Sequence, residues 1–238
     1  SDLLESFVGA ISSAIILAVS ITLASVVQSN SIPYEILEKL MYFPLVFAAV
    51  GLIASILGIA YVLLKKGSEN PHRDLNISTW SAAAITIIAG FVATYLMFAN
   101  ETKEVFAAVG FNIGFVSPWV AASLGVISGV VIGAIAEYYT SYDFKPTQMI
   151  AHASKEGPAL TITQGLAVGM KSCMFPLIVL GVTTYVSYAV SGIFGIAMAA
   201  VGMLSFVSAT VSVDTYGPIS DNAGGIAEMS ELEPEVRQ

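Results

Sequence analysis

Long, uninterrupted runs of apolar residues dominate the pattern of this chain. A helix needs roughly 20 apolar residues to cross about 30 Å of hydrocarbon, and several runs are long enough. The expected spans are approximately residues 1–27, 40–64, 79–99, 118–140, 164–190 and 193–224. Membrane-spanning β-strands would be about ten residues long with alternating polarity. The pattern therefore predicts an all-α, polytopic transmembrane helix bundle of about six helices in a single transmembrane domain.

The last two spans come from one stretch without charge, residues 172–213. Such a stretch is too long for one helix across a bilayer, so the chain has to turn back within it. Ser191 and Gly192 are the predicted hinge, because glycine adopts backbone conformations that are closed to other residues. Pro218 predicts a kink or a locally unusual helix farther along the chain.

Small residues are frequent within the spans. Gly125, Gly129 and Gly133 recur every four residues and so lie on one face of a helix. Glycines at this spacing allow helix backbones to approach closely. We therefore expect this face to pack tightly inside the bundle.

The basic residues are distributed unevenly between the two sides of the membrane. Two of them, Lys39 and Lys103, fall on one side. The other side holds Lys65, Lys66, Arg73, Lys145, Lys155, Lys171 and Arg237. Because cytoplasmic loops carry the excess of Lys and Arg, the second side is predicted to be cytoplasmic. Residues 214–229 then lie at the cytoplasmic membrane surface.

Composition supports an integral membrane protein. Apolar residues make up 56% of the chain and charged residues 11%, and the mean hydropathy is +0.81. The net charge of −8 argues against nucleic-acid binding, which requires a basic surface. Cys173 is the single cysteine, so no disulfide is expected within the chain. The chain opens on "SDLLES" and closes on "ELEPEVRQ", and we expect it to be an internal segment of a longer polypeptide.

Two acidic residues precede the first apolar run. Asp2 and Glu5 are three residues apart and share a helix face. A carboxylate within a membrane is costly and usually faces a partner or an ion pathway. One interpretation is therefore an ion path. The alternative is that both carboxylates are solvated at an interface.

Two further aspartates follow the last apolar run, within "VDTYGPISDNAGGIAEM" (213–229). Asp214 and Asp221 are seven residues apart, about two helical turns, and would share a face of a helix. Carboxylates are the ligands that a hard cation such as Mg²⁺ prefers. Nearby glycines would let a backbone or a ligand come close. The alternative is a polar helix end with an Asx turn.

Several segments resemble the signatures of the membrane-integral, ion-pumping pyrophosphatases, and they follow one another along the whole chain. Members of that family carry roughly sixteen transmembrane helices, so this chain would supply about six from the middle. The resemblance implies hydrolysis of pyrophosphate in a cytoplasmic funnel, coupled to outward pumping of H⁺ or Na⁺. The matching segments are "SDLLESFVGAI" (1–11), "EYYTSYDFKPTQ" (137–148), "GLAVGMKS" (165–172) and "VSVDTYGPISDNAGGIAEMSELEPEVR" (211–237).

The resemblance also implies roles for the four acidic residues. Asp221 matches a Mg²⁺-ligand aspartate of the catalytic funnel. Asp214 matches an acidic residue at the lower end of the funnel, which we assign to coupling. Asp2 matches the aspartate of the ion gate, and Glu5 matches a glutamate beside it. Other parts of the family's active site do not occur in this chain, so no complete catalytic set is expected here.

The same resemblance implies cofactors, partners and a location. Mg²⁺ is expected and K⁺ is left open. Pyrophosphate, the transported H⁺ or Na⁺, the lipid bilayer and a second copy of the protein are the expected partners. Plant-type proton pumps carry the gate glutamate about one turn later, where this chain has Val8, Gly9 and Ala10, so the prokaryotic plasma membrane is favoured. The alternative function is a secondary ion transporter or channel without hydrolytic activity.

Overall fold

The computed structural model describes residues 2–28, 34–64 and 71–231. These residues form helices and turns without a strand among them, which confirms the predicted all-α class. A short 3₁₀ helix, η1 (Gly114–Val116), precedes α5. The helices are α1 (Asp2–Gln28), α2 (Tyr34–Leu64), α3 (Pro71–Phe98), α4 (Lys103–Val109), α5 (Ser117–Thr140), α6 (Lys145–Ser154), α7 (Pro158–Ser205) and α8 (Val207–Met229).

Four helical segments of the described chain are long and apolar enough to cross a membrane. They are Tyr34–Leu64, Arg73–Phe98, Gly114–Ser154 and Pro158–Val211. Helix α1 adds a shorter apolar segment, Val8–Ser20. The fifth and sixth expected spans both lie within α7 and α8, because the chain reverses inside α7. The division into six spans remains a prediction.

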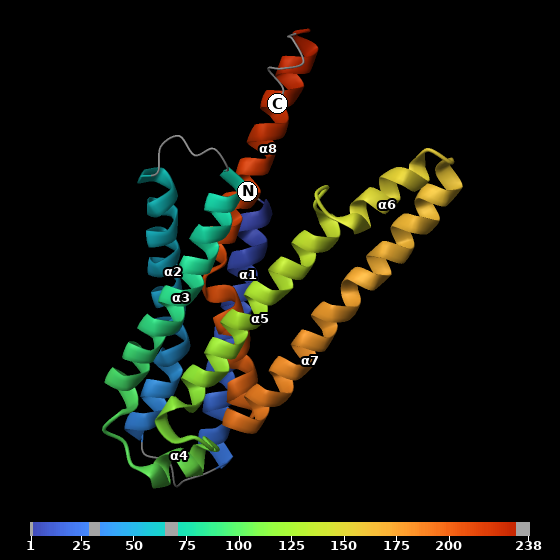
Figure 1. Ribbon diagram of the computed structural model, residues 1–238. Coiled ribbons are helices and arrows are strands. Elements are labelled where there is room, and N and C mark those ends of the chain that lie inside the picture. Colours follow the sequence, from blue (N-terminus) through green and yellow to red (C-terminus); the bar gives the residue numbers. More distant parts are fainter. Residues whose placement is uncertain (1, 29–33, 65–70, 232–238) are drawn as a thin grey trace.

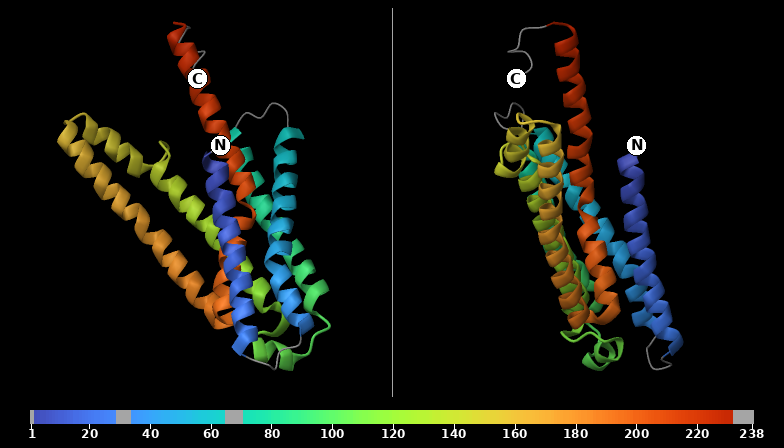
Figure 2. Two further views of the ribbon diagram at one scale, coloured as in Figure 1. Left: turned by 180° about the vertical axis from the view of Figure 1, so that it is seen from behind. Right: turned by 90° about the vertical axis from the view of Figure 1, so that its right-hand side faces the viewer.

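The helices form a bundle with an outlying arm (Figures 1 and 2). Helices α1, α2, α3 and the last part of α7 lie together. The end of α5, α6 and the first part of α7 diverge from them, and α8 projects beyond the other helices at one end. The start of α6 lies at that end and α4 lies at the opposite end, so Lys145 and Lys103 begin helices on opposite sides. This arrangement agrees with the sidedness expected from the basic residues.

The hinge predicted at Ser191 and Gly192 is confirmed. Both residues leave helical geometry, with Ser191 at φ −140°, ψ 18° and Gly192 at φ 61°, ψ −151°. The positive φ of Gly192 lies in the region that glycine enters without steric cost. The reversal leaves helix carbonyls without intrahelical partners, and Asn112 satisfies two of them. Its main-chain N–H donates to the Val190 carbonyl (3.0 Å) and its side-chain amide donates to the Ala189 carbonyl (2.6 Å).

Replacing Asn112 by alanine is expected to lower the free energy of unfolding by about 1 kcal/mol. The substitution removes the side-chain bond to the Ala189 carbonyl but keeps the main-chain bond to the Val190 carbonyl. The thermal unfolding midpoint of the detergent-solubilised full-length protein measures the loss. Asn100 is also exposed, lies at the same end and makes a suitable Asn→Ala control. A midpoint for Asn112→Ala equal to that of the control would contradict this role.

Phenylalanine side chains connect four helices near the α4 end of the bundle. Ring centroids lie 5.3 Å apart for Phe43 and Phe98, and 6.5 Å apart for Phe98 and Phe106. The series continues from Phe106 to Phe111 at 6.3 Å and from Phe111 to Phe194 at 5.7 Å. All five side chains are buried. Edge and offset contacts at such distances are favourable between aromatic rings, so they fix α4 and the α7 reversal against α2 and α3.

The segment of α7 after the reversal is held by direct contact between backbones. A Cβ added at Gly125 of α5 would collide with the main chain of Ala199. A Cβ added at Gly202 would collide with the main chain of Ala122. The two helices therefore cross at a pair of glycines, each facing the backbone of the other helix.

The expected packing of the glycine face is correct for two of its three members. Gly125 packs as described, and a Cβ at Gly129 would meet the side chains of Met203 and Phe206, both at 3.3 Å. The expectation is wrong for Gly133, where an added Cβ meets nothing within 4 Å. The reason is that α5 diverges from the last part of α7 towards its own end, so equal spacing along the helix does not give equal contact (Figure 1).

Candidate functional site

Helix α8 carries the aspartates that follow the last apolar run. It begins at Val207, directly after Phe206, and continues through Pro218 to Met229. Asp221 therefore lies well inside a helix, and the alternative of an Asx turn at this position is wrong. The seven-residue spacing places Asp214 and Asp221 about two turns apart in α8. The side chain of Asp214 lies outside the described residues.

Asp221 is exposed and lies in the second half of α8, the helix whose C-terminal part projects beyond the other helices (Figures 1 and 2). The glycines around it do not serve helix packing within the described chain, because a Cβ added at Gly217, Gly224 or Gly225 meets nothing within 4 Å. This segment offers a carboxylate on a slender, accessible helix. Such a surface suits contact with a ligand or with further chain.

The residues at the start of α1 lie at a different level from Asp221. Asp2 begins α1, and its side chain lies outside the described residues. Glu5 is exposed. Helices α1 and α8 are in contact, and the N-terminal end of α1 stops short of the projecting end of α8 (Figure 2). The structure thus brings the helices of both predicted sites into contact. Their acidic ends lie at two levels along the bundle.

The chemistry of Asp221 fits one ligand of a Mg²⁺ ion. A carboxylate is a hard oxygen donor, and Mg²⁺ takes six oxygens, several of them usually from water and from substrate phosphates. Within the described part of the chain, no group of three or more His, Cys, Asp or Glu residues gathers at one metal-binding position. Asp221 would therefore hold the ion together with oxygens from a substrate, from water or from other parts of the protein.

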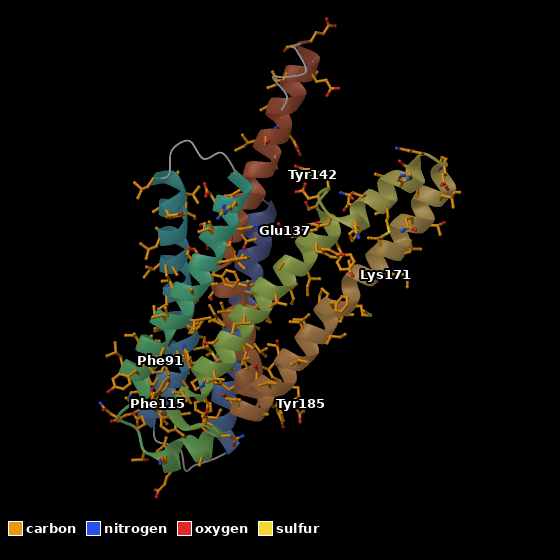
Figure 3. All side chains as sticks on the ribbon, viewed as in Figure 1. Phe91, Phe115, Glu137, Tyr142, Lys171 and Tyr185 are labelled. Carbon is orange, nitrogen blue, oxygen red and sulfur yellow. The ribbon has the colours of Figure 1, made fainter. Side chains whose placement is uncertain are left out.

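A third set of polar groups was not singled out from the sequence. The Asn76 amide nitrogen of α3 lies 3.4 and 3.5 Å from the two carboxylate oxygens of Glu137 on α5. Asp74, two residues before Asn76 and so on another side of α3, is only 4% exposed. Figure 3 shows Glu137 near the end of α5, whereas Lys171 and Tyr185 lie along the outlying part of α7. Asp74 and Glu137 stand near span ends, where carboxylates are ordinarily solvated, so the burial of Asp74 is the feature that sets it apart.

A cavity of about 390 Å³ lies next to these polar groups, between α3, α5 and the junction of α7 with α8. Asn76, Thr79 and Glu137 form its polar part. Its wall is otherwise mostly apolar and is completed by Trp80, Gly129, Val130, Ile132, Gly133, Ala134, Met203, Leu204, Phe206, Val207 and Thr210. The open space at Gly133 is part of this cavity.

A profile of the family described as "Inorganic H+ pyrophosphatase" matches residues 1–238. The chain belongs to this family. The match covers the whole chain, so it confirms the resemblance drawn from the four sequence segments. Together with the apolar helices, it shows that this pyrophosphatase chain is part of an integral membrane protein.

Named relatives include pumps for both ions. The chain is 48% identical to the "K(+)-stimulated pyrophosphate-energized sodium pump" of Thermotoga maritima, over 100% of the chain and 33% of the relative. It is 40% identical to the "Putative K(+)-stimulated pyrophosphate-energized sodium pump" of Clostridium tetani, over 100% and 32%. It is 36% identical to the "K(+)-insensitive pyrophosphate-energized proton pump" of Caldanaerobacter subterraneus, over 84% and 29%. The chain spans about a third of the length of these relatives.

Proposed function

We propose that the full-length protein hydrolyses inorganic pyrophosphate and uses the reaction to pump Na⁺ or H⁺ outward across the membrane. The observation that carries this proposal is membership of the pyrophosphatase family over residues 1–238. Relatives named as pyrophosphate-energized pumps support it. The N-terminal end of α1 and the projecting end of α8 lie at two levels of one bundle. This arrangement is compatible with a reaction site above an ion path.

Asp221 is proposed to act in hydrolysis by holding Mg²⁺. When bound, that ion would neutralise pyrophosphate oxygens and orient the attacking water. Positioning and charge neutralisation carry most of the catalysis in phosphoryl transfer. Asp221 is exposed in the described chain, so its carboxylate is not used in packing α8 against the other described helices. Asp214, two turns deeper in the same helix, is proposed to act in coupling.

Asp2 and Glu5 are proposed to act in ion transport. They lie at the start of α1, the helix that contacts α8. A carboxylate within a membrane is costly and is typically retained to form an ion or proton path. Contact between the two helices offers a direct mechanical route from Asp221 to this path.

Named relatives differ in the transported ion and in their response to K⁺. Relatives of comparable similarity are named as sodium pumps and as proton pumps, and as K⁺-stimulated and K⁺-insensitive. We propose Mg²⁺ as cofactor and keep K⁺ as a candidate activator. We also propose a homodimer in the plasma membrane of a prokaryote, which the relatives' bacterial origin supports.

The proposal is tested with the full-length protein in sealed vesicles. Phosphate release from pyrophosphate is measured with and without Mg²⁺, Na⁺ and K⁺, while a pH-sensitive dye follows the vesicle interior. We expect Mg²⁺-dependent phosphate release accompanied by Na⁺ uptake or acidification. Ion movement without any phosphate release would contradict the proposal and favour a secondary transporter or channel.

Replacing Asp2 by alanine is expected to lower ion transport at least about tenfold, which corresponds to a transport barrier raised by about 1.4 kcal/mol. The reason is that the carboxylate is proposed to lie in the ion path. Vesicle transport assays measure the loss, with Glu104→Gln as control because Glu104 is an exposed carboxylate on α4, at the opposite end of the bundle. Transport at the control rate by Asp2→Ala would contradict the assignment.

A further inference from the structure

We propose that the junction of α7 and α8 is a hinge that Ser55 of α2 positions, and that α8 moves into the adjoining cavity during turnover. The proposal deepens the proposed function, on which it rests, because α8 carries Asp221. It makes Ser55 a positioning residue, acting through α8 on the Mg²⁺ ligand.

The junction interrupts helical geometry at Phe206. This residue has φ −100° and ψ 7°, whereas α-helical residues lie near −63° and −42°. The Phe206 carbonyl accepts an i+3 hydrogen bond from the Ala209 N–H (3.1 Å), as in a 3₁₀ turn. Neither proline nor glycine occurs at residues 205–207, so the break is imposed by the surroundings rather than by a helix-breaking residue.

The two sides of the break differ in how firmly they are held. On the α7 side, a Cβ added at Gly51 of α2 would collide with the main chain of Ser205. Gly202 contacts Ala122 of α5 in the same manner. On the α8 side, burial decreases along the helix, and residues 217–223 are exposed. The break therefore lies between a segment fixed by backbone contacts and a helix that is packed at its start, where Ala209 is buried, and exposed from residue 217 onward within the described chain.

Ser55 has a hydrogen-bond acceptor available both before and after a movement of α8. Its hydroxyl lies 2.9 Å from the Gly51 carbonyl of its own helix and 3.2 Å from the Phe206 carbonyl at the break. The side chain is completely buried. A hydroxyl has a single proton, so it donates fully to only one carbonyl at a time. When α8 moves away, Ser55 keeps the bond to Gly51, and no buried donor is left unsatisfied.

The cavity provides the space for the movement. Packed protein interiors resist deformation, so a helix tilts most readily towards an open volume. The cavity is bounded by Phe206, Val207 and Thr210 of the junction and by Gly129 and Gly133 of α5. An added Cβ at Gly133 meets nothing within 4 Å, so a large side chain placed there would occupy this space without a collision in α5.

The movement is measured by the distance between two spin labels in the full-length protein. Met229 at the end of α8 and Tyr142 after α5 are both exposed and are replaced by labelled cysteines, after the exposed Cys173 and other cysteines are removed. We expect the distance distribution to shift when Mg²⁺ and the non-hydrolysable analogue imidodiphosphate are added. Absence of a shift would overturn the hinge.

Two substitutions test the Ser55 hydrogen bond and the cavity separately. Without ligand, Ser55→Ala is expected to change the ratio of the two distance populations about fivefold, as loss of one hydrogen bond would, and Ser55→Thr is expected to restore it. With ligand, Gly133→Leu is expected to suppress the shift and to lower kcat about tenfold with KM little changed. Gly133→Ala, which leaves most of the cavity open, is its control.

Ser128→Ala is the control for Ser55→Ala. Ser128 is also buried, and its hydroxyl donates to the Gly125 carbonyl of its own helix at 2.8 Å. An equal change in both variants would overturn the role of Ser55, and an unsuppressed shift in Gly133→Leu would overturn the role of the cavity. The ligand-free comparison needs no substrate, so its result is independent of whether pyrophosphate is hydrolysed. Absence of phosphate release by wild-type protein would instead contradict the proposed function.

Discussion

Replacing Asp221 by alanine is expected to lower pyrophosphate hydrolysis by the full-length protein at least about a hundredfold, in the range seen when one charge-stabilising group is removed from a catalytic site. Asp221 is exposed and lies in the second half of α8. If it holds Mg²⁺ next to pyrophosphate, its removal leaves the substrate charge poorly neutralised. The measurement is phosphate release by purified protein over a range of free Mg²⁺.

The control for this prediction is Asp143→Ala. Asp143 is also an exposed aspartate, placed in the turn between α5 and α6 at the same end of the molecule. We expect this variant to hydrolyse pyrophosphate at the wild-type rate. We also expect Asp221→Ala to keep the wild-type unfolding midpoint, because an exposed side chain contributes little to stability. Wild-type hydrolysis by Asp221→Ala at low free Mg²⁺ would refute its role as a ligand.

Replacing Gly202 by alanine is expected to destabilise the protein by about 3 kcal/mol, the upper end of the range typical for overpacking. The added Cβ would collide with the main chain of Ala122, and a backbone cannot rotate away as a side chain can. Gly125→Ala would collide with Ala199 from the other side of the same crossing. The two helices would have to separate, which disrupts the packing of α5 against the last part of α7.

Gly133→Ala is the matched control, because it lies on the same helix as Gly125 but has open space around it. An alanine in a helix is more favourable than glycine by up to about 1 kcal/mol, so the control is expected to be neutral or slightly stabilised. Expression in membranes and the thermal unfolding midpoint in detergent measure both effects. Equal midpoints for Gly202→Ala and Gly133→Ala would show that the crossing relaxes without cost.

Local signals in the sequence predicted much of the architecture. Long apolar runs predict helices because a bilayer leaves no other way to satisfy the backbone. The uncharged stretch 172–213 required a reversal, and its glycine predicted the place, which φ 61° at Gly192 confirms. The four acidic candidates came from charge at the ends of apolar runs and from family resemblance. Their helices are placed by the structure, but their roles remain proposals.

The break at Phe206 shows where local signals end. Leu204, Ser205, Phe206 and Val207 read as an ordinary continuation of an apolar helix. The carbonyl at the break accepts a hydrogen bond from Ser55, which lies 151 residues away in sequence. Pairing across such a separation leaves no periodic or compositional trace in a single sequence.

The sequence by itself determined the helical class, the reversal at Ser191 and Gly192, the sidedness expected from the basic residues and the family. These properties follow from the hydrophobicity, charge and conformational freedom of neighbouring residues. Only the tertiary structure decided that Gly125 contacts a backbone while Gly133 borders a cavity, and that Ser55 stands between two carbonyls. The physical reason is that helix divergence and crossing points depend on contacts between distant segments, which equal spacing along one helix cannot specify.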